Sequence, residues 1–139
     1  MPRMLVLLLL ASCASTPREP AVTASSPAAD VVQKQLDAYN AQDVEAFAAT
    51  YAQDVVITRG PEKKVWLQGR EALRETYAKM FAKYPACRAR IAERRLEGDA
   101  VVLDHEIITG RGPERPEPWD VGFVRYQVAS GLIQRVELP

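Results

Sequence analysis

The sequence predicts an α+β domain in which three N-terminal helices pack against a mostly antiparallel sheet. Between Pro27 and Pro85, apolar residues recur mainly at helical spacing, with two short β-rich runs between the second and third helical stretches. From Arg88 onward, long runs rich in β-branched and aromatic residues alternate with short turn sequences. Helices followed by hairpin-linked strands are typical of α+β domains.

The expected helices have recognisable ends. Ser26 is a suitable N-cap and Pro27 suits the first helical position. Asp43 is the expected cap of a second, short helix, and the third helix begins after Gly69 and ends before Pro85. One face of the first helix carries apolar residues at positions i, i+4 and i+7, namely Val32, Leu36 and Tyr39.

Two short strands are expected at 55–58 and 65–67, joined by a turn at Gly60-Pro61. Four longer strands follow the third helix. Turns at 97–99 and 130–131 and a Gly/Pro-rich loop at 110–118 connect them as hairpins. The longer strands are expected at 88–96, 100–109, 119–128 and 132–138.

Two of these strands are apolar on both faces. On the strand 100–109, Val101 and Leu103 alternate with Val102, and the strand 119–128 shows the same two-sided pattern. A sheet with one solvated face would alternate more cleanly between apolar and polar residues. The helices can cover one face, so we expect a homodimer that packs through the other.

The composition limits the classes of partner. The chain has 139 residues, 18 basic and 18 acidic, and therefore no net charge at neutral pH. A neutral domain lacks the basic surface that nucleic acid binding requires, so we expect no nucleic acid partner. No sequence motif indicates a cofactor or a metal site, and Cys87 is expected to be a small buried residue.

The N-terminus carries an apolar run at 4–10 that is too short to span a bilayer. The run fits the core of a secretory signal. It is followed by Leu10-Ala11-Ser12-Cys13, which resembles the lipobox of bacterial lipoproteins, in which the cysteine is acylated and becomes the first residue of the mature protein. A plain signal peptide, or an apolar tail from a misassigned start, is the alternative.

This resemblance divides the chain into three parts. Residues 1–12 would be a lipoprotein signal peptide, and 13–29 would be the lipidated Cys13 and a disordered tether of small, polar and proline residues. Residues 30–139 would be the folded domain. The expected location is the cell envelope, on the periplasmic side of a bacterial membrane or on the outer face of the plasma membrane in a single-membrane cell.

Three short segments, in this order, carry a second resemblance: 38–43 (AYNAQD), 51–55 (YAQDV) and 69–73 (GREAL). With the order of the elements, they resemble the nuclear-transport-factor-2-like superfamily, in its SnoaL-like and ketosteroid-isomerase-like branches. The resemblance covers roughly residues 30–138. It implies a cone-shaped fold in which a curved sheet wraps three helices, with a pocket for an apolar small molecule at the open end.

Ketosteroid isomerases use a carboxylate base and strong hydrogen-bond donors at the oxyanion. The family's oxyanion aspartate lies in a Pro-X-Asp step that Pro118-Trp119-Asp120 matches, and Tyr77 matches a supporting tyrosine. The oxyanion tyrosine falls on Gln35, and the base falls on Arg59. An arginine cannot act as a base. The guanidinium of Arg59 would either pair with a pocket carboxylate or meet the anionic end of a ligand.

The resemblance therefore places a set of residues around the pocket. The aromatic members could line a cavity or belong to the core, and periodicity does not separate these two roles. The expected pocket residues are Gln35, Tyr39, Tyr51, Arg59, Trp66, Tyr77 and Asp120.

The segment Asp104-His105-Glu106 contains the only histidine. Neighbours on a strand point to opposite faces, so His105 cannot join either carboxylate at one metal ion. Asp104 and Glu106 share a face and are either acidic pocket groups or members of cross-strand ion pairs. His105 is interpreted as a hydrogen-bonded structural or dimer-face residue, with a catalytic role as the alternative. The expected ion-pair partners of the carboxylates are Arg59, Arg88 and Arg90.

Two functions follow from these patterns. The first is a membrane-anchored domain that binds a small apolar ligand or a protein partner without isomerase activity. The second is an isomerase-like or cyclase-like enzyme that acts on an apolar carbonyl or polyketide-like substrate through Asp120, with Tyr77 and His105 as further candidates. No cofactor is expected for either function.

Overall fold

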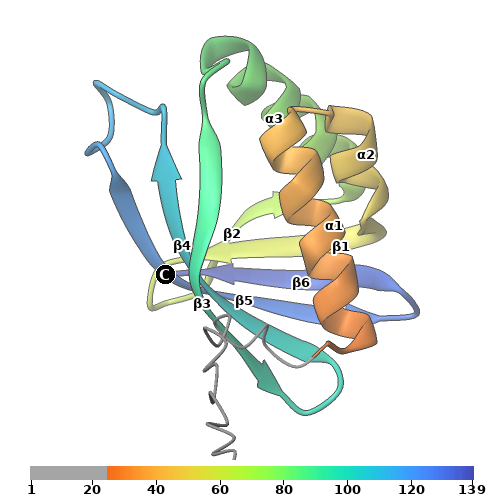
Figure 1. Cartoon of the computed structure of the whole chain (residues 1–139). Coiled ribbons are helices and arrows are strands. Elements are labelled where there is room, and N and C mark those ends of the chain that lie inside the picture. Colours follow the sequence, from red (N-terminus) through yellow and green to blue (C-terminus); the bar gives the residue numbers. More distant parts are fainter. Residues whose placement is uncertain (1–24) are drawn as a thin grey trace, which may run out of the picture.

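The computed structural model describes residues 25–139, which form three helices and one six-stranded sheet (Figure 1). The signal peptide and lipidated cysteine predicted for residues 1–13 lie outside the described residues, as does most of the predicted tether. In chain order, the elements are α1 (Pro27–Ala41), α2 (Val44–Ala49), β1 (Tyr51–Arg59), β2 (Lys64–Gln68), α3 (Arg70–Lys83), β3 (Arg88–Glu97), β4 (Val101–Thr109), β5 (Trp119–Ala129) and β6 (Leu132–Leu138).

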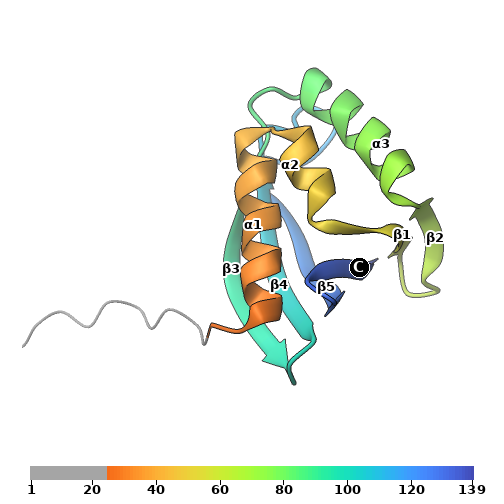
Figure 2. The same ribbon diagram turned by 90° about the vertical axis from the view of Figure 1, so that its right-hand side faces the viewer.

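The sheet confirms the predicted α+β class. Its strand order is β2-β1-β6-β5-β4-β3, and in the described chain every neighbouring pair is antiparallel except β1 and β6. The sheet curves around the helices, which lie on its concave side (Figures 1 and 2). Helix α1 packs against β3 to β6, and α3 packs against β1 and β2. This arrangement is the cone that the resemblance implies.

Helix α1 begins where its caps predict. The Ser26 hydroxyl accepts a hydrogen bond from the Ala29 amide at 3.0 Å, and Pro27 occupies the first turn. Ala28 and Ala29 are both buried against the domain. Within the described residues, α1 starts at Pro27, so residues 27–29 belong to the folded part and not to the tether predicted at 13–29. Alanine suits a tether and a tightly packed helix equally well, which is why composition misplaced the boundary.

The core lies between the helices and the concave face of the sheet. It contains one ion pair, in which Arg94 Nε and Nη2 each donate to a carboxylate oxygen of Asp104 at 2.7 Å. Asp104 is 1% exposed, and Arg94 is its register partner on β3. Asp104 therefore pairs with Arg94, whereas the sequence analysis expected one of three other arginines as its partner. Cys87 is buried, as expected, with its Sγ 3.0 Å from the hydroxyl oxygen of Tyr39.

A β-bulge interrupts the pairing of β4 with β5. Glu106 is opposite Gly122 while Ile107 is opposite Asp120, so Val121 is an extra residue on β5. Gly122 has a φ of 90°, a backbone conformation that glycine adopts without steric penalty. The bulge reverses the side-chain alternation on either side of it. Trp119 and Val121 consequently face the concave side, and Asp120 faces away.

The convex face of the sheet is partly covered within the chain itself. The guanidinium carbon of Arg95 lies 4.5 Å from the ring centroid of Phe123, and the His105 ring lies 5.0 Å from it. In residues 25–139, Val65 is the single large hydrophobic residue that is exposed, at 61%. The homodimer expected through this face stays a prediction. No helix in the described part of the chain is both long and apolar enough to cross a bilayer.

Candidate functional site

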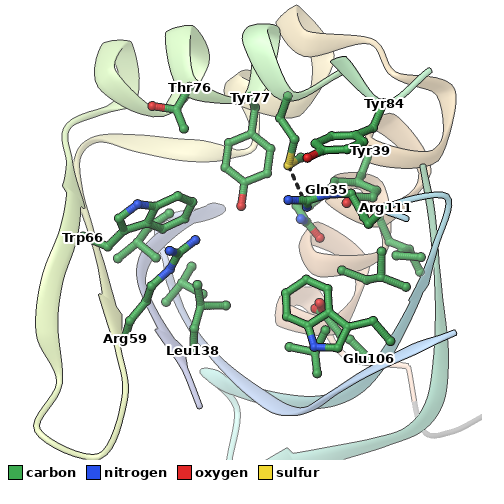
Figure 3. Close-up of a pocket in the computed structure, with 18 of the residues that line it drawn as sticks. Gln35, Tyr39, Arg59, Trp66, Thr76, Tyr77, Tyr84, Glu106, Arg111 and Leu138 are labelled. Atoms are coloured by element: carbon green, nitrogen blue, oxygen red, sulfur yellow. Dashed lines mark hydrogen bonds between the residues drawn. The ribbon is translucent and has the colours of Figure 1, made fainter. Parts of the chain in front are cut away.

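A cavity of about 590 Å³ opens between the helices and the concave face of the sheet (Figure 3). Pockets of this size hold small organic molecules, for which the usual range is roughly 300 to 1,000 Å³. Its wall is formed mainly by aromatic and aliphatic side chains, with a few polar groups between them. The aromatic members of the wall are Tyr39, Tyr51, Trp66, Tyr77, Tyr84, Trp119 and Tyr126.

The structure brings most of the predicted site residues together around this cavity. Tyr77 projects from α3 with its hydroxyl directed into the cavity, and Gln35 lies in the cavity wall on α1 (Figure 3). Burial raises the pKa of the Tyr77 hydroxyl, and the nearby Arg59 and Arg111 oppose that rise. The predicted residues in the wall are Gln35, Tyr39, Tyr51, Arg59, Trp66 and Tyr77.

Asp120 is the exception and must be corrected. Its side chain is 64% exposed and lies outside the cavity wall, because the bulge at Val121 turns it to the convex face. Its Oδ1 accepts a hydrogen bond from the Gly122 amide at 3.0 Å and lies 2.8 Å from His105 Nε2. The hydrogen bond with His105 is the main reason that the pKa of Asp120 is lowered.

His105 is hydrogen-bonded on the convex face, in agreement with its structural interpretation. Asp120 lies on the same face. Neither His105 nor Asp120 is therefore placed to act on a substrate inside the cavity, as the enzyme hypothesis required. Within residues 25–139, no three side chains of the histidine, cysteine, aspartate or glutamate type gather closely enough to hold a metal ion.

Arg59 lies at the end of β1, and its guanidinium stacks on the indole of Trp66 with 3.3 Å between Cζ and the ring centroid. Burial is the main cause that lowers the pKa of Arg59, and Arg115 and Arg111 lower it further. None of the ion pairs in the described residues involves Arg59. The pairing with Asp120 that the sequence allowed is therefore not formed.

Sequence reasoning missed two further arginines in the cavity wall, Arg111 and Arg115. Both lie in the loop 110–118, which joins β4 to β5 and folds back over α3 and β5. The carboxylate of Glu117 closes this loop by accepting the Gly110 amide hydrogen at 3.0 Å from each of its oxygens. The Gly/Pro-rich sequence predicted a loop, but gave no signal of where the loop would fold.

Glu106 is the one acidic side chain among the described residues of the cavity wall. The hydroxyl of Tyr126 donates a hydrogen bond to its Oε1 at 2.5 Å. Burial raises the pKa of Glu106 from 4.5 to about 7, although the hydrogen bond from Tyr126 lowers it. Sequence reasoning offered Glu106 as an acidic pocket group or as an ion-pair member, and the structure shows the first. Near neutral pH, this carboxyl can donate or accept a proton.

Solved structures share this architecture. An uncharacterized cystatin-fold protein from Novosphingobium aromaticivorans is 28% identical, with 84% of this chain and 99% of that chain covered and a TM-score of 0.71. A candidate polyketide cyclase from Sinorhizobium meliloti is 24% identical, with 79% and 94% covered and a TM-score of 0.66. A candidate ketosteroid isomerase from Kribbella flavida is 20% identical, with 81% and 78% covered and a TM-score of 0.63.

The last two structures establish a shared fold and nothing about activity. Among curated proteins, none matches the chain. A model of the SnoaL-like domain family matches residues 32–136, which is most of the sequence, and the chain therefore belongs to the SnoaL-like domain family.

Proposed function

We propose that this protein is a lipid-anchored binding protein whose cavity holds a small apolar molecule without isomerising it. The observation that carries the proposal is the cavity of about 590 Å³ with its largely aromatic wall. Aromatic and aliphatic walls with a few converging polar groups are typical of small-molecule sites. The apolar wall would supply the binding free energy, and the polar groups would orient the ligand.

The absence of isomerase chemistry is supported by two positions. The base of the isomerase-like family falls on Arg59, which stacks on Trp66 and remains protonated. The counterpart of the oxyanion aspartate, Asp120, lies outside the cavity wall. Proton abstraction from carbon needs a base within hydrogen-bond reach of the substrate, and neither position supplies one.

Titration with the neutral fluorophore N-phenyl-1-naphthylamine tests the binding proposal. We expect a saturable rise in fluorescence with one site per chain. Ala89 lies in the cavity wall on β3, so Ala89→Phe should fill part of the cavity and weaken binding about tenfold or more. Ala92 is exposed on the same strand, which makes Ala92→Phe the matched control. Absence of binding, or equal binding by both variants, would refute the proposal.

A second candidate function is catalysis on an apolar carbonyl or polyketide-like substrate. Glu106 favours it, because a cavity carboxyl with a pKa of about 7 is suited to proton transfer. Tyr77 would be the accompanying hydrogen-bond donor. This catalytic function would depend on Glu106, whereas the sequence analysis had assigned the acid/base role to Asp120, whose side chain is exposed.

The proposed location is the cell envelope, with the domain held at a membrane through lipid on Cys13. The apolar run and the lipobox-like quartet that follows it support this location. Intact mass of protein extracted from membranes should show an acyl increment on Cys13 and loss of residues 1–12. Cys13→Ser should abolish the increment. An unmodified Cys13 behind an intact N-terminus would contradict the proposal.

We further propose a homodimer as the form of the soluble domain, with a different protein partner as the alternative occupant of the convex face. Half-buried apolar side chains such as Leu103 and Phe123 on that face support it. Sedimentation of the fragment that begins at Ser25 should give a dimer at micromolar concentration. A monomer at that concentration would contradict the homodimer and favour a different protein partner on the convex face.

A further inference from the structure

Among the cationic side chains of the cavity wall, three are arginines, and each of them lies against an aromatic ring. Arg59 Cζ lies 3.3 Å from the Trp66 centroid, and Arg115 Cζ lies 4.5 Å from that of Trp119. Arg111 Cζ lies 4.5 Å from the Tyr84 centroid. None of the three arginines belongs to an ion pair among the described residues. The guanidiniums therefore reach the cavity without a carboxylate to neutralise them.

The polar atoms of Arg111 are poorly satisfied. Its Nη1 lies 3.1 Å from the thioether sulfur of Met80, a weak acceptor, as the dashed line in Figure 3 marks. Its Nε is buried and has no hydrogen-bond partner. A buried donor on a charged group without a partner is strongly unfavourable, and an arginine cannot relieve this by losing its proton. Within residues 25–139, the guanidinium of Arg111 therefore has no acceptor at Nε and only a weak one at Nη1.

The arginines also act on one another. Arg59 and Arg111 are directed into the cavity from opposite walls, and both oppose the rise in the pKa of Tyr77 (Figure 3). Like charges gathered around a partly apolar space repel each other, and a bound anion would convert this repulsion into attraction. The acidic side chain of the described wall, Glu106, accepts the hydrogen bond of Tyr126 and is partly protonated near neutral pH.

We propose that the ligand is an amphipathic organic acid whose single anionic head binds between Arg59 and Arg111, with its apolar body against the aromatic wall. A carboxylate matches the planar guanidinium through two parallel hydrogen bonds. Two cations also suit a monoanion better than a neutral carbonyl or hydroxyl. This inference deepens the proposed binding function and rests on it.

A pair of probes separates the charge from the apolar body. 1-Anilinonaphthalene-8-sulfonate has the skeleton of N-phenyl-1-naphthylamine with one sulfonate added. Arg59→Gln and Arg111→Gln should each weaken binding of the sulfonate about tenfold more than binding of the neutral probe. Retained binding of the neutral probe shows that the variant cavity is folded. Arg90→Gln removes the same charge from an exposed position of β3 outside the cavity wall and should change neither affinity.

Competition extends the test to a carboxylate. Decanoate should displace the sulfonate probe from the wild-type protein at a concentration about tenfold lower than 1-decanol does, and this advantage should disappear in Arg111→Gln. Equal loss of both probes in the arginine variants, or an effect of Arg90→Gln as large as that of Arg59→Gln, would overturn the inference. If the wild type binds neither probe, the binding function itself fails. If it binds the neutral probe but the arginine variants do not discriminate, only this inference fails.

Discussion

The hydroxyl of Tyr126 donates a hydrogen bond of 2.5 Å to the carboxyl of Glu106, inside a cavity that otherwise carries positive charge. Burial raises the pKa of Glu106 to about 7, against 4.5 in its ordinary surroundings. Between these two values the folded chain holds a proton that the unfolded chain has released. The free energy of unfolding should therefore fall as the pH rises through this window and level off above it.

Replacing Glu106 with glutamine should remove this pH dependence. A pKa difference of this size corresponds to at most about 3 kcal/mol, and water in the open cavity will reduce it. The stability of Glu106→Gln relative to wild type should thus be higher at pH 8 than at pH 5. Urea unfolding at both pH values measures the change. Glu75→Gln, at an exposed position of α3, should track the wild type, and an equal response of both variants would contradict the assignment.

The ion pair of Arg94 with Asp104 should matter for stability far more than the surface pairs. Asp104 is almost fully buried, so Arg94→Met leaves an uncompensated carboxylate and should lower the free energy of unfolding by about 3 kcal/mol. Adding Asp104→Leu should recover most of this loss. Arg95, on the same strand, pairs with Glu93 at the surface, and Arg95→Met should lower the free energy of unfolding far less than Arg94→Met does. A double variant as unstable as Arg94→Met would show that packing, and not the charge, decides the effect.

The corrected start of the domain predicts a difference between two fragments. A fragment that begins at Asp30 lacks the Ser26 cap and the buried Ala28 and Ala29, which a fragment from Ser25 retains. The shorter fragment should be less stable by about 1 to 3 kcal/mol, from the lost cap and the lost apolar contacts. Ser26→Ala in the longer fragment should account for about 1 kcal/mol of this. If the two fragments unfolded at the same midpoint, the residues before Asp30 would not contribute to the stability of the domain.

The sequence predicted the helices and most strands because apolar spacing, caps and turn residues are local signals. Ser26, Asp43 and Pro85 mark helix ends, and the structure has those ends within two residues of the predicted positions. The parallel pairing of β1 with β6 joins the first strand of the sequence to the last, and no local pattern encodes it.

The site was less predictable. The extra residue Val121 reverses the faces of Trp119 and Asp120, and alternation alone cannot locate a bulge. Gly122 was the available hint, since a glycine inside a strand often marks one. Arg111 reaches the cavity because its loop folds back over Tyr84, and that path depends on tertiary contacts.

Gly110 should control the position of this loop. It has a φ of 78°, and a Cβ built on it would lie 2.3 Å from the carbonyl oxygen of Ala86. Gly110→Ala should therefore displace the loop, weaken binding of the sulfonate probe more than binding of the neutral one, and lower stability by more than about 1 kcal/mol. Gly98→Ala is the matched control, because Gly98 also has a positive φ but has open space around it. If Gly110→Ala and Gly98→Ala changed probe binding equally, Gly110 would have no specific influence on the cavity.

The wild-type protein should not isomerise a β,γ-unsaturated ketosteroid. The position of the family's base holds Arg59, and Asp120 lies outside the cavity wall, so a bound steroid would meet neither a base nor the family's oxyanion carboxyl. Arg59→Asp should stay near background, because Gln35 is a weaker donor than a tyrosine hydroxyl, and adding Gln35→Tyr should give only a trace of turnover. The absorbance of the conjugated product measures all three proteins against a heat-inactivated control. Turnover by the wild type that disappears in Glu106→Gln would establish Glu106 as a base and favour the catalytic function over binding alone.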